Sequence, residues 1–168
     1  MILDGDRASL EHPAAAELGG GAPAVVAVVL EFRGRVALLK RGRENLEDHA
    51  TWHWIVGPCE SGLSPSFRAM ECLFLQTGLS VTSLTSWDMG KPFHVDEGGG
   101  RQSVVYPFRA SSSQRRLVLG EEHDSYRWTT RSRVARFSGR IPWVDDVLAA
   151  VEAIGPSTSI GGEGCGEA

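Results

Sequence analysis

The chain has 168 residues, of which 42% are hydrophobic, and a formal net charge of −4. An apolar content of this size suits one folded domain. The negative charge supplies no positive field for general binding to a nucleic acid backbone, and no apolar run approaches the roughly 18 residues of a membrane span. We therefore expect a soluble, single-domain protein that binds neither nucleic acids nor membranes.

Cysteine and glycine usage indicates the compartment and the limits of the domain. The three cysteines cannot all pair with one another, and residues 1–7 contain no apolar stretch of the kind found in secretory signals, so we expect a cytoplasmic protein. Glycine clusters predict flexible segments at residues 1–22 and 155–168. These limits leave residues 23–154 as the folded domain.

Apolar runs predict the first strands. Residues 24–32 and 35–40, joined by a turn at Arg33 and Gly34, predict a β-hairpin with well-buried strands. Residues 52–56 predict a third short strand, which Gly57 and Pro58 are expected to stop.

The next segment predicts a helix of about three turns. Ser64 is a suitable N-cap, Pro65 suits the first helical position, and Gly78 after Thr77 suits the C-terminal end. The apolar residues of this segment occupy nearly the whole helix circumference: Phe67, Met70, Cys72, Leu73, Phe74 and Leu75. Because this leaves no polar stripe, we expect the helix to be covered on most sides.

The remaining elements complete a mixed architecture. Residues 79–87, 102–110 and 125–129 predict further strands, and residues 143–153 predict an amphipathic helix. Strands and helices in this irregular order indicate a mixed α/β sandwich.

Residues 57–79 resemble the Nudix box, the signature motif of the Nudix hydrolase superfamily. That motif reads Gly, five residues, Glu, seven residues, then Arg-Glu-apolar-any-Glu-Glu-any-Gly-apolar, and Gly57, Leu73, Gly78 and Leu79 match it without an insertion. Residues 122–128 also resemble the Glu-His-x-x-Tyr-Arg-Trp segment found late in many Nudix domains. The resemblance covers about residues 23–153 and implies a Nudix-like α/β/α sandwich with a mixed β-sheet.

Every charged position of the motif is replaced in this chain. Leu63 stands in place of the first Glu, Glu71 in place of Arg, and Cys72 in place of the next Glu. Leu75 and Gln76 replace the final Glu-Glu pair. In an intact box, the helix carboxylates hold magnesium against a diphosphate, whereas a thiol, an alkyl group and a neutral amide suit magnesium poorly. We therefore expect no metal ligands, no cofactor and no metal-dependent diphosphate hydrolysis.

The altered helix face predicts a site for a largely apolar small molecule. Cys72, Leu75 and Gln76 would form its wall, and Trp54 and Trp128 are further candidate binding residues. The alternative is that the pocket has collapsed and these side chains extend the core. Burial in the helix also predicts a raised pKa and an inert thiol for Cys72.

Four residues are candidates for acid–base catalysis. Glu60 ranks first because its loop adjoins the altered helix face, and His53, which should point opposite to the tryptophans that flank it, ranks second. Glu122 matches a glutamate that positions metal or water in some relatives, such as diadenosine tetraphosphate hydrolases. His94 shares one face of an extended segment with Asp96.

Three functions remain open at this point. The first is a metal-independent enzyme that acts on a largely apolar small molecule by acid–base catalysis. The second is a non-catalytic module that binds a small molecule or regulates a partner. The third is a residual hydrolase of nucleoside diphosphate derivatives with relocated metal ligands. In each case the expected partner is a small molecule, and a homodimer is an option.

Overall fold

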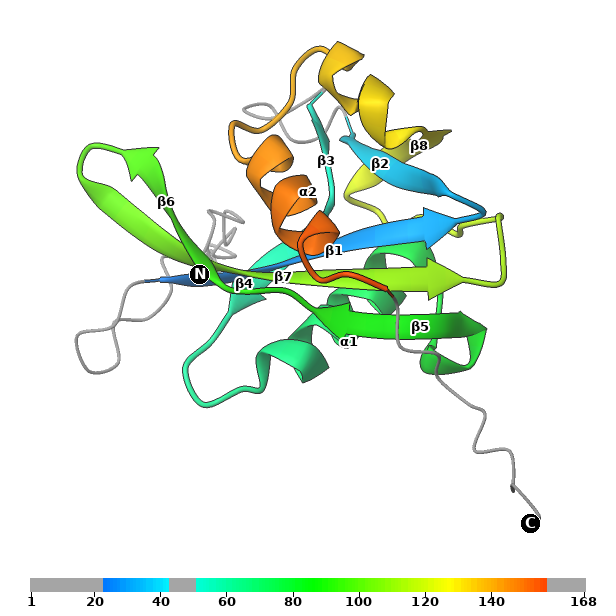
Figure 1. Ribbon diagram of the computed structural model, residues 1–168, viewed down its shortest axis with the longest axis horizontal. Helices are drawn as coiled ribbons and strands as arrows, with labels where there is room; N and C mark the ends of the chain where they lie inside the picture. Colours follow the sequence, from blue (N-terminus) through cyan, green and yellow to red (C-terminus); the bar gives the residue numbers. More distant parts are fainter. Residues whose placement is uncertain (1–22, 43–50, 157–168) are drawn as a thin grey trace, which may run out of the picture.

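Strands and helices account for most of the residues that the computed structural model describes, which are 23–42 and 51–156 (Figure 1). The strands are β1 (Ala24–Phe32), β2 (Arg35–Arg41), β3 (Trp52–His53), β4 (Ile55–Cys59), β5 (Leu84–Met89), β6 (Phe93–Gly98), β7 (Arg101–Ser112) and β8 (His123–Thr129). The helices are α1 (Pro65–Thr77) and α2 (Val144–Glu152), with short 3₁₀ segments η1 (Val81–Ser83) and η2 (Arg131–Arg136). The segment predicted to be flexible at residues 1–22, and the predicted tail from residue 157 onward, lie outside the described residues.

β1 is the central strand of a mixed sheet. It pairs in parallel with β7 and antiparallel with β4, whereas it pairs with β2 only beside the turn, at Glu31 with Val36 and Phe32 with Arg35. β2 continues the sheet through β3 and β8, and β7 does so through β5 and β6. The predicted β1–β2 hairpin is therefore confined to its turn, because most of β1 pairs with β4 and β7 instead.

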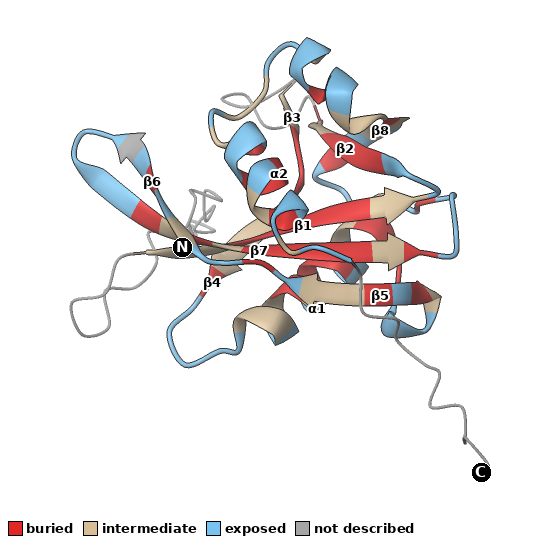
Figure 2. Cartoon of the chain, viewed as in Figure 1, coloured by how far each residue is buried: buried red, intermediate tan, exposed pale blue. Residues whose placement is uncertain are grey.

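The two long helices cover opposite faces of this sheet. Successive residues of β1 alternate between two cores: Val26, Val28 and Leu30 belong to the cluster that includes α1, and Ala27 and Val29 belong to the cluster that includes α2. The middles of β1 and β7 are buried between these layers (Figure 2). The protein thus has the predicted single-domain α/β fold with a mixed sheet.

The ends of α1 follow from local sequence signals, as predicted. The Ser64 hydroxyl accepts a hydrogen bond from the Phe67 amide at 3.3 Å, and Pro65 occupies the first turn. Gly78 ends the helix with a φ of 73°, and its amide donates to the Phe74 carbonyl at 2.8 Å. A positive φ of this size favours glycine over any residue with a side chain.

The predicted coverage of α1 is wrong. The helix buries one narrow face, formed by Ala69, Cys72, Leu73 and Thr77. The side chains of Phe67, Phe74 and Leu75 are 62%, 55% and 59% exposed. Apolar residues on every side of a helix do not indicate which side meets the sheet. Here the buried side carries Leu73 with three smaller residues, and the phenylalanines lie outside it.

Gly57 and Pro58 do not stop the third predicted strand. After a break at Trp54 the chain continues as β4 to Cys59, and Pro58 pairs with Val25 of β1. Among the described residues β1 is the sole strand partner of β4, which makes β4 an edge strand, where proline is tolerated. No helix within the described residues has the length and apolar character needed to cross a membrane.

Candidate functional site

The altered face of α1 lies directly against the backbone of β4. A Cβ atom added at Gly57 would overlap the sulfur of Cys72, so the glycine allows close contact between helix and strand. The side-chain amide of Gln76 donates to the Val56 carbonyl, with Nε2 and O 2.7 Å apart. Oε1 of Gln76 is buried and has no hydrogen-bond partner among the described residues. Of the three side chains on this face, Cys72 and Gln76 therefore hold the helix onto the strand.

The thiol of Cys72 is neutral in this environment. The residue is 2% exposed, and burial raises the pKa of its thiol to about 11. Arg68 opposes this rise in pKa, whereas Glu71, Glu122 and Cys59 add to it. The predicted burial and raised pKa agree with the structure, and because reactivity requires the thiolate we expect an inert thiol.

Leu75 lies on the outer side of α1, beside the loop of residues 113–122. A Cβ atom added at Gly120 would come within 2.6 Å of the Leu75 carbonyl oxygen, and the Val118 amide donates to the Thr77 carbonyl at 2.9 Å. Val118 also packs against Gly78. The loop thus rests on the C-terminal end of α1, and the exposed side chain of Leu75 does not extend the core.

A hard divalent cation does not fit the donor atoms of this face. Cys72, Leu75 and Gln76 offer a neutral thiol, no donor and one amide oxygen, whereas magnesium requires several hard oxygen ligands. Glu71, the remaining acidic residue of the helix, is exposed and forms an ion pair with Arg68. Across residues 23–42 and 51–156 there is no group of three or more His, Cys, Asp or Glu residues placed to hold a metal ion.

The four acid–base candidates lie in different environments. Glu60 is exposed in the loop before α1, and Glu122 is exposed in the loop before β8. His94 is exposed on β6. His53 is 1% exposed, and its ring lies on the opposite side of β3 from the neighbouring tryptophans, as the strand alternation predicts.

His53 contacts His123, a pairing that the sequence did not predict. The two Nε2 atoms are 3.1 Å apart, and Nδ1 of His53 is hydrogen-bonded to the Trp54 carbonyl. A carbonyl only accepts, so Nδ1 of His53 carries the proton, and His123 donates from Nε2 to Nε2 of His53. Burial lowers the pKa of His123 to about 4; Arg41 lowers it further and Asp124 opposes the shift. His123 is thus neutral at pH 7, and because its partner lies 70 positions away in the sequence, the pairing left no local signal.

Trp54 lies on the other face of the sheet from Cys72. Its side chain is completely buried in the cluster that includes α2, and its indole Nε1 donates to the Val144 carbonyl at 2.9 Å. It is therefore unavailable to a ligand beside Cys72, and the expectation that it lines that site is corrected. Its large apolar ring is used in the core.

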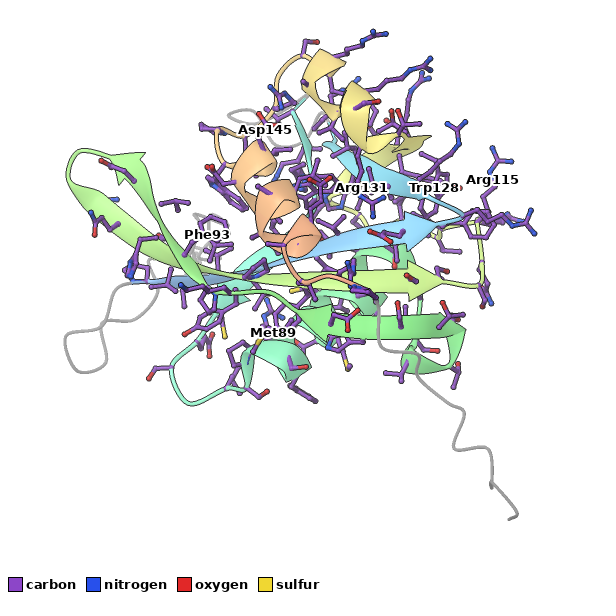
Figure 3. All side chains as sticks on the ribbon, viewed as in Figure 1. Met89, Phe93, Arg115, Trp128, Arg131 and Asp145 are labelled. Carbon is purple, nitrogen blue, oxygen red and sulfur yellow. The ribbon has the colours of Figure 1, made fainter. Side chains whose placement is uncertain are left out.

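One pocket lies where β8 meets the loop before it. Its volume is about 480 Å³, and its lining residues are Arg115, Arg116, Tyr126, Arg127 and Trp128. Arg115 and Trp128 lie at the same end of the sheet (Figure 3). Trp128 was expected to bind a ligand on the altered face of α1, but no lining residue of this pocket belongs to α1. The adjacent arginines at 115 and 116 were the available sequence signal for this site.

A second pocket, of about 760 Å³, lies between α2 and the connection from β5 to β6. Its lining includes Met89 and Phe93, which are labelled in Figure 3, and Ala149, Ala150 and Ala153 from the α2 end of the chain. His94 also lines this pocket. Glu60, His53 and Glu122 do not, so the acid–base candidates do not converge on either pocket.

Comparison with solved structures identifies the fold. The structure is similar to a Nudix hydrolase from M. smegmatis, RenU, with 22% sequence identity, a TM-score of 0.59, and coverage of 80% of this chain and 87% of that one. A NUDIX hydrolase from Nitrosomonas europaea has 15% identity and a TM-score of 0.62, covering 79% and 90%. The MutT protein from Methanosarcina mazei Go1 has 12% identity and a TM-score of 0.63, covering 83% and 99%. Protein-family models and curated proteins showed no match to the sequence. The chain therefore has the fold of the Nudix hydrolases.

Proposed function

We propose that this protein binds a small molecule without a metal ion and has lost the metal-dependent hydrolysis of diphosphates. The hydrogen bond from the Gln76 amide to the Val56 carbonyl carries the proposal. A carboxylate at this position could not donate to that carbonyl, so the helix face that holds a cation in an intact Nudix box instead fastens α1 to β4. Cys72 supports the same conclusion, because its neutral sulfur packs against Gly57.

Binding is favoured over the predicted acid–base enzyme by the separation of the candidate groups. His53 is buried and hydrogen-bonded to His123, and Glu60 and His94 lie on different elements, each exposed to solvent. General acid–base catalysis needs its groups within hydrogen-bond reach of one substrate. A hydrolase with relocated metal ligands is less favoured, because the described residues contain no cluster of metal-binding side chains.

The direct test is a hydrolysis assay with a panel of nucleoside diphosphate derivatives, with magnesium and with manganese. We expect no turnover above that of a boiled sample. Turnover of about 1–10³ s⁻¹ that disappears on chelation would contradict the proposal, since that is the ordinary range for an enzyme.

A second test examines the bond that carries the proposal. Gln76→Glu places a carboxylate against the Val56 carbonyl and should lower the free energy of unfolding by about 1–3 kcal/mol, measured by urea denaturation. Glu71→Gln, on the exposed side of the same helix, is the control and should change stability by less than about 0.5 kcal/mol. A manganese-dependent rise in the Tm of the wild type, reversed by EDTA, would mean that the folded protein binds the metal and would contradict the proposal.

A further inference from the structure

The pocket lined by Arg115, Arg116, Tyr126, Arg127 and Trp128, here called the arginine–tryptophan pocket, concentrates positive charge on an acidic protein. In the part of the chain that the structure describes, none of its three arginines forms an ion pair. Residues 113–120 and the neighbouring strand β2 contain no acidic residue, whereas Glu121, Glu122 and Asp124 follow along the chain. None of these three carboxylates forms an ion pair with the arginines of the pocket.

On β8, Arg127 pairs with Leu38 and alternates to the face opposite Tyr126 and Trp128, so Arg115 and Arg116 are the arginines that supply positive charge beside the two aromatic rings. An anion there would meet guanidinium groups that form no ion pair with a carboxylate of the described residues.

The backbone of the loop that carries two of these arginines is already held in place. The Trp128 indole Nε1 donates to the Arg115 carbonyl at 3.0 Å, and the Leu117 amide donates to the Tyr126 hydroxyl at 3.3 Å. Leu117 is itself buried in the core. The loop therefore need not be ordered on binding, which removes part of the entropic cost of taking up a ligand.

The aromatic side chains give the same pocket a planar, apolar wall. Trp128 is half-buried and packs against Phe32, with ring centroids 5.7 Å apart. The guanidinium of Arg33 lies 5.3 Å from the centre of the Phe32 ring, so a further cation contacts an aromatic ring beside Trp128. A volume of about 480 Å³ lies within the range of about 300–1,000 Å³ usual for small-molecule sites.

We infer that the arginine–tryptophan pocket binds a small molecule that joins a planar ring to an anionic group, either a carboxylate or a phosphate. The arginines would hold the anion, and Trp128 and Tyr126 would contact the ring. This inference rests on the proposed function, since it names the class of ligand. The pocket has no lining residue from α1, so it is separate from the altered helix face.

Calorimetric titration of the full chain with phenyl phosphate and with benzoate, in EDTA, tests the inference. We expect at least one of the two to bind, and the preferred one distinguishes a phosphate ligand from a carboxylate ligand. Inorganic phosphate should bind at least threefold more weakly than phenyl phosphate if phosphate is preferred, because it has no ring. Benzyl alcohol, which has the ring without the charge, should not bind measurably.

Two matched variants locate the binding. Arg115→Gln with Arg116→Gln should weaken the preferred probe at least tenfold, because both arginines line the pocket. Arg133→Gln with Arg136→Gln removes the same charge from exposed positions in η2, outside the pocket, and should weaken it less than twofold. Equal weakening by both pairs would show general electrostatic attraction and overturn the inference.

The outcome is separable from that of the proposed function. If neither phenyl phosphate nor benzoate binds to the folded wild type, the arginine–tryptophan pocket is not a site for ring-bearing anions, and the result of the metal-dependent hydrolysis assay is unaffected. If that assay instead shows metal-dependent turnover, the proposed function fails whatever the arginine variants do.

Discussion

α1 and α2 cover opposite faces of one sheet, but they distribute their side chains in opposite ways. α2 buries four large aliphatic residues: Val144, Val147, Leu148 and Val151. Part of α2 is exposed (Figure 2), and its less buried positions are acidic residues and alanines. α1 instead buries mostly small or polar side chains and exposes Phe67, Phe74 and Leu75. Burial against the sheet thus accounts for the sequence of α2, whereas it accounts for only one face of α1.

The largest effect is expected from the tryptophan that anchors α2. Trp54→Ala removes a fully buried ring and the hydrogen bond that its indole donates to the Val144 carbonyl, and it should lower the free energy of unfolding by about 3–5 kcal/mol or abolish folding. Trp87→Ala, on the α1 side, removes a half-buried ring that stacks on Phe108 and donates to the Ser66 hydroxyl. It should lower the free energy of unfolding by less than Trp54→Ala does. Urea denaturation measures both. A larger loss for Trp87→Ala would reverse the comparison.

A smaller effect is expected from acid, because the α1 side contains the buried histidine pair. The pKa of His123 is about 4 in the folded protein and about 6.5 in the unfolded chain, so between these values the unfolded state binds the extra proton. The contribution to stability is complete above pH 6.5 and is lost as the pH falls to 4, by up to about 3 kcal/mol.

Urea denaturation from pH 7.5 to pH 4 measures this dependence. In His123→Phe the part of the slope due to His123 should vanish, although the variant starts from a lower stability because the hydrogen bond between His53 and His123 is lost. An unchanged slope in the variant would assign the acid sensitivity to other groups.

The smallest effect is expected on the exposed side of α1. Phe74→Gln should change the free energy of unfolding by less than about 0.5 kcal/mol, because the ring is already more than half exposed. Leu148→Gln, at a buried position of α2, should cost several times more. Equal losses for the two variants would mean that α1 is covered after all, as its sequence predicts.

Local sequence signals predicted where the elements begin and end better than they predicted which side chains are buried. Ser64, Pro65 and Gly78 act within a few residues of α1, so its ends could be predicted from the sequence. Which side of α1 meets the sheet depends on β4. Because apolar residues lie all around the helix, the sequence did not indicate its buried face. Similarly, η1 delays the strand expected from residue 79 until Leu84, and β6 carries too little apolar alternation to be predicted.

The candidate site was less predictable because it depends on contacts between distant segments. His53 meets His123 only where β8 lies beside β2 and β3, and Trp128 contacts the arginine-bearing loop 13 positions earlier in the chain. Strand alternation did predict that His53 and Trp54 point to opposite faces. Alternation could not predict that Trp54 faces the core that includes α2, because its partner in that core, Val144, lies 90 positions later in the sequence.

The buried sulfur of Cys72 makes the docking of α1 chemically measurable. Because the thiol is covered by β4 and its pKa is about 11, an alkylating reagent at neutral pH can modify it only while the helix is detached from the strand. The rate of modification, followed by mass spectrometry of the peptides, therefore reports how often α1 detaches from β4. If Cys72 is alkylated faster than the whole chain unfolds, α1 opens as a unit of its own while the rest of the sheet stays folded.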